Sequence, residues 1–195
     1  LCLRTPADRG TDFGMKLLWR VAFALLIAAA SAPAAYAAEG VQLAEQKIKA
    51  GLIYNFLKYT HWPGVVDHAP MVVCLLGGDP FDGHLGPLAG RTVNQHTIEV
   101  RKISSGAEAA KCAVLIVHGD ERPSWTELRK KLSAQDILTV ADFDGFATDG
   151  GMIEFSRVDN RIGVKVNVDA VAATHLEVQE RLLKLASIVH SPREP

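Results

Sequence analysis

Residues 142–170 read "DFDGFATDGGMIEFSRVDNRIGVKVNVDA". The first ten positions hold three acidic residues and three glycines, and two runs of alternating apolar and polar residues follow. Such a loop could bind a metal, hold a phosphate or simply lead into a β-hairpin. The alternation predicts strands at 151–158 and 161–168, joined at Asp159 and Asn160, two residue types that tolerate a tight turn.

The two ligand-binding interpretations of the loop fit the sequence poorly. An EF-hand loop needs oxygen ligands at alternate positions and a glutamate at the twelfth. Counted from Asp142, the twelfth residue is Ile153. A phosphate loop needs glycines directly before a helix, whereas Gly150 and Gly151 run into a predicted strand. We therefore interpret the loop as a turn that feeds the hairpin.

The segments around this hairpin alternate between strands and helices. Apolar runs and period-two alternation predict strands at 71–77, 97–103, 112–119 and 136–142, and helical spacing of apolar residues predicts helices at 43–62, 123–132 and 178–190. Ser124 and Glu127 have the spacing of a capping box for the second helix. This order favours an α/β fold, a three-layer sandwich with a mixed, mostly parallel sheet flanked by helices and a C-terminal antiparallel hairpin.

Composition excludes several function classes. The chain has 195 residues, a net charge of −1, 48% hydrophobic residues and 22% charged residues, which is ordinary globular composition. No basic run is present, so we expect no nucleic-acid partner. The histidines and cysteines lack metal-ligand spacing, and no serine or cysteine stands in a nucleophile elbow. We therefore expect no metal, no cofactor and no enzymatic activity.

The N-terminal region has the pattern of a secretory signal peptide. Met15 is followed by Lys16 and Arg20, an apolar run of about a dozen residues and the small pair Ala35 and Ala37. The run is shorter than the ~20 residues of a spanning helix, so we expect no direct membrane insertion. We predict cleavage near Ala37, a periplasmic product and one domain over 38–195, and we interpret residues 1–14 as an upstream artefact.

The two cysteines of the predicted mature chain, Cys74 and Cys112, suggest a disulfide. An even number of cysteines in an exported protein raises the expectation of pairing. Cys74 lies in the middle of one predicted strand, whereas Cys112 begins another. This offset is a difficulty, because paired cysteines need Cα atoms within about 7 Å.

Polar residues follow three predicted strands. Asp79, His118 and Asp142 each lie at or just beyond a carboxyl end. In open α/β sheets, ligands tend to bind in the crevice at these ends. The three side chains could line one ligand crevice, and the alternative is that they are ordinary turn residues.

Four segments resemble the YfiR-like family. "IKAGLIYNFLKYTHWP" is similar to the family's opening helix, "VVCLLGGDPFDGHL" to its strand ending in G-x-D-P-F-G, and "CAVLIV" to its C-H-V-L-F-I strand. "ILTVADFDGFATDGGMIEFSRVDNRIGVKVNVDAV" is similar to its segment with the G-F-A-x-x-G-G-M-I pattern. The matches follow one another in order and cover nearly the whole predicted mature chain.

The resemblance implies a periplasmic regulator that represses an inner-membrane diguanylate cyclase by binding its periplasmic domain, with lower cyclic-di-GMP and less biofilm as the result. Our candidate contacts are Tyr54, Tyr59 and Trp62 of the first helix and Arg161 of the hairpin. The default interpretation of Arg161 is a solvated strand residue, and an exposed Arg161 could also pair with an acidic ligand or partner. A small-ligand sensor, for a nucleotide or amino acid, remains the alternative. A homodimer also remains open.

Overall fold

The computed structural model describes residues 33–133, 135–158 and 161–192, and helix α2 (Pro33–Tyr59) is the first element within these ranges. The chain divides into two compact units at the Ala44–Glu45 boundary, and α2 contributes to both. Of the first unit, the structure describes residues 33–44, which are helical. Residues 1–32, which hold the upstream segment and most of the predicted signal peptide (15–37), and the predicted turn at Asp159 and Asn160 lie outside the described residues, so all three stay predictions.

The second unit, residues 45–195, is built on an eight-stranded sheet. In spatial order its strands are β10 (Ser187–Val189), β8 (Arg161–Asn167), β7 (Ile153–Val158), β6 (Leu138–Ala141), β5 (Val114–Val117), β2 (Met71–Leu76), β4 (His96–Ile103) and β3 (Thr92–Val93). Neighbouring strands run parallel except in the β7–β8 and β3–β4 pairs. The sheet is therefore mixed and mostly parallel, as predicted.

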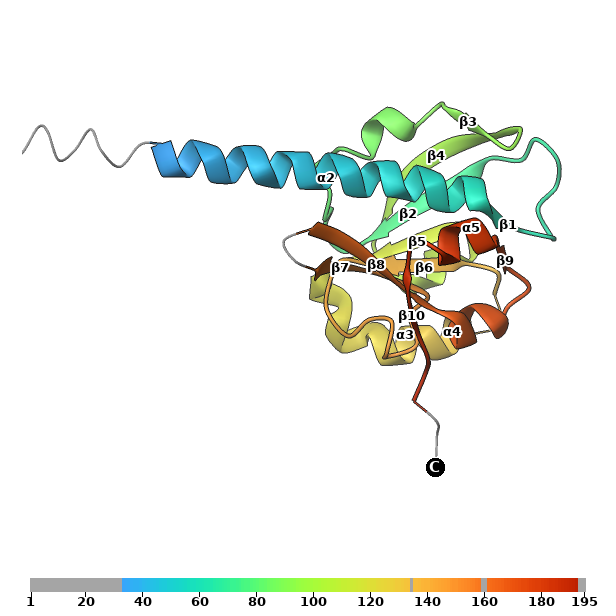
Figure 1. The fold of residues 1–195 in the computed structure, drawn as a ribbon. Helices are drawn as coiled ribbons and strands as arrows, with labels where there is room; N and C mark the ends of the chain where they lie inside the picture. The colour runs from blue at the N-terminus through green and yellow to red at the C-terminus, as the bar shows by residue number, and fades with distance from the viewer. Residues whose placement is uncertain (1–32, 134, 159–160, 193–195) are drawn as a thin grey trace, which may run out of the picture. The chain divides into compact units, whose positions relative to one another are not determined.

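Helices cover both faces of this sheet (Figure 1). The remaining elements are α3 (Trp125–Leu132), α4 (Val168–Ala172), α5 (Glu180–Leu183), the 3-10 helices η1 (Gly86–Leu88), η2 (Gly106–Lys111) and η3 (Gly119–Ser124), and a small second sheet of β1 (Thr60–His61) and β9 (Glu177–Val178). The C-terminal half of α2 and the helix α3 lie on opposite sides of the strands in Figure 1.

The alternation of side chains along β2 shows how the two cores form. Val73 and Leu75 pack in the core under α2, and Cys74 packs in the core under α3. Because successive strand residues point to opposite faces, one fully buried strand supplies both cores. On α2, Ile53 and Leu57 share a buried face at helical spacing. The predicted three-layer sandwich is confirmed.

The acidic stretch 142–151 is the turn that the sequence predicts. It leads into the antiparallel β7–β8 hairpin, whose register pairs Val158 with Arg161. The ring of Phe146 is completely buried, 4.4 Å from the centroid of Trp125. It occupies the space where Gly151 would carry a Cβ atom. Gly151 therefore permits the close packing that folds the loop onto the sheet.

The C-terminal segment differs from its prediction. We expected one helix over 178–190, but α5 ends at Leu183 and Ser187–Val189 forms β10, parallel to β8. Leu185, one of the apolar residues whose helical spacing (Leu182, Leu185, Ala186 and Val189) predicts that helix, is 83% exposed. The edge of β8 offers unpaired backbone groups that the segment satisfies, and the β-branched Ile188 and Val189 favour a strand.

The predicted capping box is also displaced. Ser124 precedes α3, but its side chain makes no cap hydrogen bond and its Oγ donates instead to Glu121. A capping box occurs at Ser105 and Glu108, at the start of η2. Ser105 and Glu108 have the same sequence spacing as Ser124 and Glu127, so spacing alone does not distinguish the two pairs. The local backbone determines which pair forms a capping box.

Candidate partner-binding surface

The C-terminal half of α2 carries half-buried tyrosines that contact cationic side chains. Tyr54 lies under the guanidinium of Arg91, 4.9 Å from the ring centroid, and its hydroxyl reaches the carbonyl oxygen of Thr92 at 3.5 Å. Asn94 Nδ2 donates to the carbonyl oxygen of Lys58 at 3.1 Å. The turn around β3 is thereby held against the helix.

Tyr59 continues this surface toward α5. Lys58 Nζ lies 5.4 Å and Arg181 Cζ 5.5 Å from the centroid of its ring. The amide of Gln179 donates to the carbonyl oxygen of Tyr59, and β1 pairs with β9 directly beyond. The C-terminal segment is thus fixed beside the end of α2.

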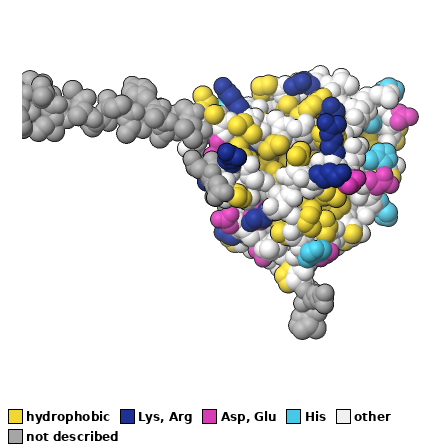
Figure 2. Space-filling view, in the orientation of Figure 1, with side chains coloured by type: hydrophobic (Ala, Val, Ile, Leu, Met, Phe, Trp, Pro, Cys, Tyr) yellow, Lys and Arg dark blue, Asp and Glu magenta, His cyan; other side chains and the backbone are white. Residues whose placement is uncertain are grey.

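We name this group the α2–α5 surface, defined by Tyr54, Lys58, Tyr59, Arg91 and Arg181. Figure 2 shows Lys and Arg side chains among hydrophobic ones over the C-terminal half of α2 and over α5. Aromatic and arginine side chains are enriched where protein partners bind, because they combine large contact area with directed polar groups. The surface therefore has the chemistry of a protein contact.

Trp62, the third aromatic candidate from this region, is corrected to a core residue. Its side chain is only 5% exposed, and its indole nitrogen donates to the carbonyl oxygen of Ala113 at 3.2 Å. The tryptophan anchors the segment after α2 to the start of β5. It offers a partner no appreciable surface.

Arg161 is exposed at the first position of β8. The same hairpin end places Arg157 beside Glu45, with an ion pair between their side chains. Glu45 lies two and a half turns before Tyr54, about 14 Å along the helix axis. Arg161 is thus a candidate contact at a different part of the molecule from the α2–α5 surface.

The predicted ligand crevice does not form as one cavity. Asp79 accepts hydrogen bonds from the amides of Phe81 and Gly83, both at 2.9 Å, and so shapes its own turn. His118 caps η3 and approaches Asp120, with Nδ1 3.1 Å from Oδ2. These are the local contacts of turn residues.

Asp142 faces a separate polar cavity of about 230 Å³, which neither Asp79 nor His118 lines. Lys49 Nζ, on a lysine only 6% exposed, contacts both Asp142 carboxylate oxygens, at 2.9 and 2.8 Å, and Glu45 Oε1 at 2.7 Å. Burial raises the pKa of the Asp142 carboxyl, although Lys49 opposes that rise. The hydrogen bond from Lys49 lowers the pKa of Glu45. This cluster ties α2 to the end of β6.

The disulfide between Cys74 and Cys112 is present, with Cα atoms 5.8 Å apart. The difficulty of the strand offset disappears because β2 and β5 are adjacent, and the amide of Ala113 donates to the carbonyl oxygen of Val72. Cys112 therefore lies beside the first half of β2. The bridge is buried in the core under α3.

Residues 46–187 match the YfiR/HmsC-like family. The chain belongs to this family. The match covers all of the sheet except the last two residues of β10. No curated protein matches the chain.

Several polar residues that organise this YfiR/HmsC-like domain were not singled out as candidates from the sequence. Glu154, fully buried, accepts from the amide of Ala147 at 2.9 Å and from Lys165 at 2.7 Å. Asn167, also fully buried, donates to the carbonyl oxygen of Ala147 and caps α4 through the amides of Asp169 and Ala170. One available signal is a polar residue at an inward-facing strand position, and for Asn167 a second is its place in the segment that resembles the family.

These buried side chains hold the 142–151 loop in place, a structural role. Within the ranges that the structure describes, no group of three or more His, Cys, Asp or Glu side chains could hold a metal ion. Over the same residues, no helix has the length and apolar composition to cross a membrane.

Proposed function

We propose that this protein is an exported regulator that binds the periplasmic domain of an inner-membrane diguanylate cyclase and represses it. Cyclic-di-GMP signalling and biofilm formation fall as a consequence. Membership of the YfiR/HmsC-like family, over residues 46–187, is the observation that carries the proposal. The periplasmic location and the identity of the partner both belong to the proposal.

The disulfide supports export. Disulfides persist in oxidising compartments and are rare where thiols are kept reduced. The bridge joins Cys74, in β2, to Cys112, two residues before the adjacent strand β5. A protein that stabilises its central sheet in this way is suited to the periplasm, in agreement with the signal peptide predicted for residues 15–37.

The chemistry of the described side chains favours binding over catalysis. Both cysteines of the second unit are joined in the disulfide and are not available as nucleophiles. The side-chain contacts of His118, His175 and His190 are with aspartates, at 3.1–3.2 Å, in exposed or half-exposed positions. Such pairs lack the nucleophile that a histidine base would activate.

We propose the α2–α5 surface as the contact with the cyclase. Tyr54 and Tyr59 would supply contact area, and Arg91 and Arg181 would pair with carboxylate or carbonyl groups of the partner. Because the guanidinium groups already lie against the tyrosine rings, part of their conformational entropy is lost before binding. The hairpin end at Arg161 is the second candidate contact.

The proposal is tested by charge reversal in cells that express the cognate cyclase. Arg91→Glu and Arg181→Glu should each raise cyclic-di-GMP toward the level of the gene deletion while the melting temperature changes little, because both side chains are exposed. Lys130→Glu, on α3 at the other face of the sheet, is the matched control and should repress normally.

Full repression by both arginine variants would exclude the α2–α5 surface. Arg161→Glu then tests the hairpin contact in the same assay. Full repression by all three variants would leave neither surface as the contact.

A further inference from the structure

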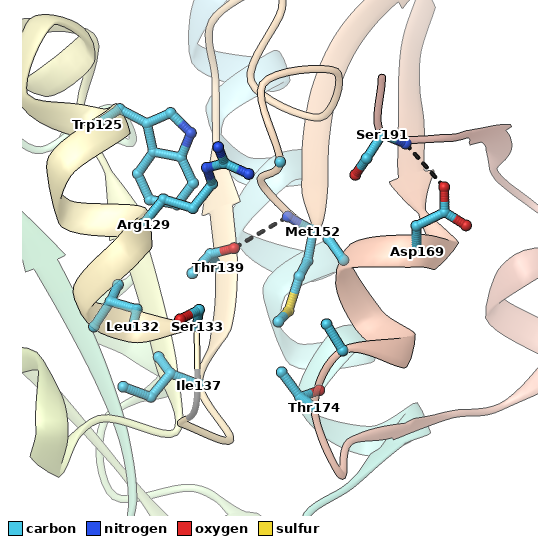
Figure 3. A pocket seen from close by; sticks show the side chains of 13 residues that line it. Trp125, Arg129, Leu132, Ser133, Ile137, Thr139, Met152, Asp169, Thr174 and Ser191 are labelled. Atoms are coloured by element: carbon cyan, nitrogen blue, oxygen red, sulfur yellow. Dashed lines mark hydrogen bonds between the residues drawn. The ribbon is translucent and has the colours of Figure 1, made fainter. Parts of the chain in front are cut away.

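A small cavity lies between α3 and α4, on the α3 side of the hairpin (Figure 3). Its volume is about 160 Å³. A cavity of about 150 Å³ is large enough for a benzene-sized molecule. The lining combines apolar side chains with a few polar groups, a composition typical of ligand sites.

Arg129 supplies the positive charge of the cavity. Its Nε is completely buried and has no hydrogen-bond acceptor among the described residues. A buried donor on a charged group is destabilising until an acceptor is provided. In Figure 3 the guanidinium lies on one side of the cavity, at the loop that leads to Met152.

Gly150 leaves room for the guanidinium of Arg129. A Cβ atom at this glycine would lie 2.5 Å from Nη1 and 2.6 Å from Cδ of Arg129. Gly150 has a φ of +83°, in the left-handed region that favours glycine. The absence of a side chain at Gly150 therefore leaves the space that Arg129 fills beside the 142–151 loop.

Arg129 is the one Lys or Arg side chain among the described residues that line the cavity. Asp169 lies across the cavity from Arg129 in Figure 3 and accepts from the amide of Ser191 at 3.0 Å. The Asp169 carboxylate also contacts Nδ1 of His190 at 3.1 Å, so it already has partners of its own. Leu132, Ile137 and Met152 give the rest of the cavity an apolar lining.

We propose that this cavity binds a small monocarboxylate. The planar guanidinium of Arg129 matches a carboxylate in geometry and charge, and the apolar body of the ligand would pack against Leu132, Ile137 and Met152. Inorganic phosphate and dicarboxylates fit less well, because they carry more charge than one guanidinium balances. The proposal concerns ligand binding alone and does not depend on repression of a cyclase.

The test is titration of the purified protein with benzoate and butyrate by calorimetry, with thermal unfolding as a second readout. We expect saturable binding with a dissociation constant of about 0.1–1 mM, since so small a ligand has few atoms with which to gain free energy. Benzamide and butyramide, which keep the shape and lack the charge, should bind at least about 10-fold more weakly, as expected for the loss of a charged hydrogen bond.

Three variants locate the binding. Arg129→Met should weaken benzoate binding about 10- to 100-fold, the range expected when a charged hydrogen bond is removed. Ala170→Leu should weaken it by filling the cavity from α4. Lys130→Gln removes the same charge from an exposed neighbour on α3 and should leave the affinity unchanged.

Several results would overturn the proposal. One is that neither benzoate nor butyrate binds saturably. Another is that benzoate binds folded Arg129→Met and Ala170→Leu with unchanged affinity. A third is that the amides bind as tightly as the corresponding carboxylates. Binding of phosphate or succinate as tight as that of benzoate would overturn the assignment to monocarboxylates.

Discussion

Removing the disulfide should lower the stability of the protein by a large and calculable amount. The bridge joins residues 38 positions apart. In the chain-entropy model, a loop of this length restricts the unfolded chain enough to stabilise the fold by about 4 kcal/mol. Small proteins are stable by only about 5–15 kcal/mol. The disulfide therefore accounts for about a quarter or more of a typical free energy of unfolding.

We expect the double variant Cys74→Ala/Cys112→Ala to lose about 4 kcal/mol of unfolding free energy in urea. Its melting temperature should fall by roughly 8–16 °C, from the usual 2–4 °C per kcal/mol at this size. Wild-type protein reduced while unfolded and refolded without oxidant is the control, because it retains both sulfur atoms in the core. A loss below about 1 kcal/mol in both samples would refute the entropic reasoning.

Three further predictions concern buried polar groups and close packing. Lys49→Met should cost about 3 kcal/mol at pH 7, the lower end for a broken buried ion pair, because it leaves the partly buried Asp142 carboxylate without its cation. Burial already raises the pKa of Asp142 above the ordinary value of 3.8, so this carboxyl takes up a proton more readily in the folded protein than in the unfolded chain. Urea unfolding should therefore show that the cost shrinks as the pH falls from 7 to about 4, and a constant cost would contradict this account. Asn167→Ala should cost about 2–4 kcal/mol in the same assay, because a carbonyl and two amides lose their buried partner, and a neutral result would contradict the hydrogen bonds described. Gly151→Ala should lower the free energy of unfolding by about 1–3 kcal/mol, and with it the melting temperature, because the added Cβ would overlap the buried ring of Phe146. Gly119→Ala is the matched control: its Cβ meets open space, so the melting temperature should not change. Equal effects of the two substitutions would contradict this account of the packing.

The sheet could be predicted because its strands carry local signals. β2, β5 and β6 are short apolar runs, which is typical of parallel strands buried on both faces. In β7 and β8, apolar and polar residues alternate, and only two residues separate the two strands, which is typical of a hairpin. In each case the hydrophobic pattern of one segment contains the information.

Features that depend on distant segments were not predictable in the same way. The stripe from Leu182 to Val189 has helical spacing, but the free edge of β8 is a property of the folded sheet and not of that stripe. Tryptophan is a residue type that is common at partner contacts, but Trp62 is buried, and the carbonyl oxygen of Ala113 accepts the hydrogen bond of its indole. Both outcomes are decided by tertiary structure, which overrides local pattern.

The candidate ligand crevice shows the same limit. Asp79, His118 and Asp142 do follow neighbouring parallel strands, as the sequence predicts. The direction of each side chain depends on its partners, and Lys49, 93 residues before Asp142, determines the environment of that aspartate. Arg129 was not identified as a candidate because a single arginine on an amphipathic helix is usually solvated.

The most direct test of the proposed function is cyclic-di-GMP content in the source organism with and without this gene. The cognate cyclase must be shown to be expressed, and the deletion strain should be complemented with the full chain and with a form in which a single methionine replaces residues 1–37. We predict that deletion raises cyclic-di-GMP and surface adhesion, that the full chain restores both to the original level, and that the form without the predicted signal peptide does not. An unchanged cyclic-di-GMP level after deletion would contradict repression of a diguanylate cyclase.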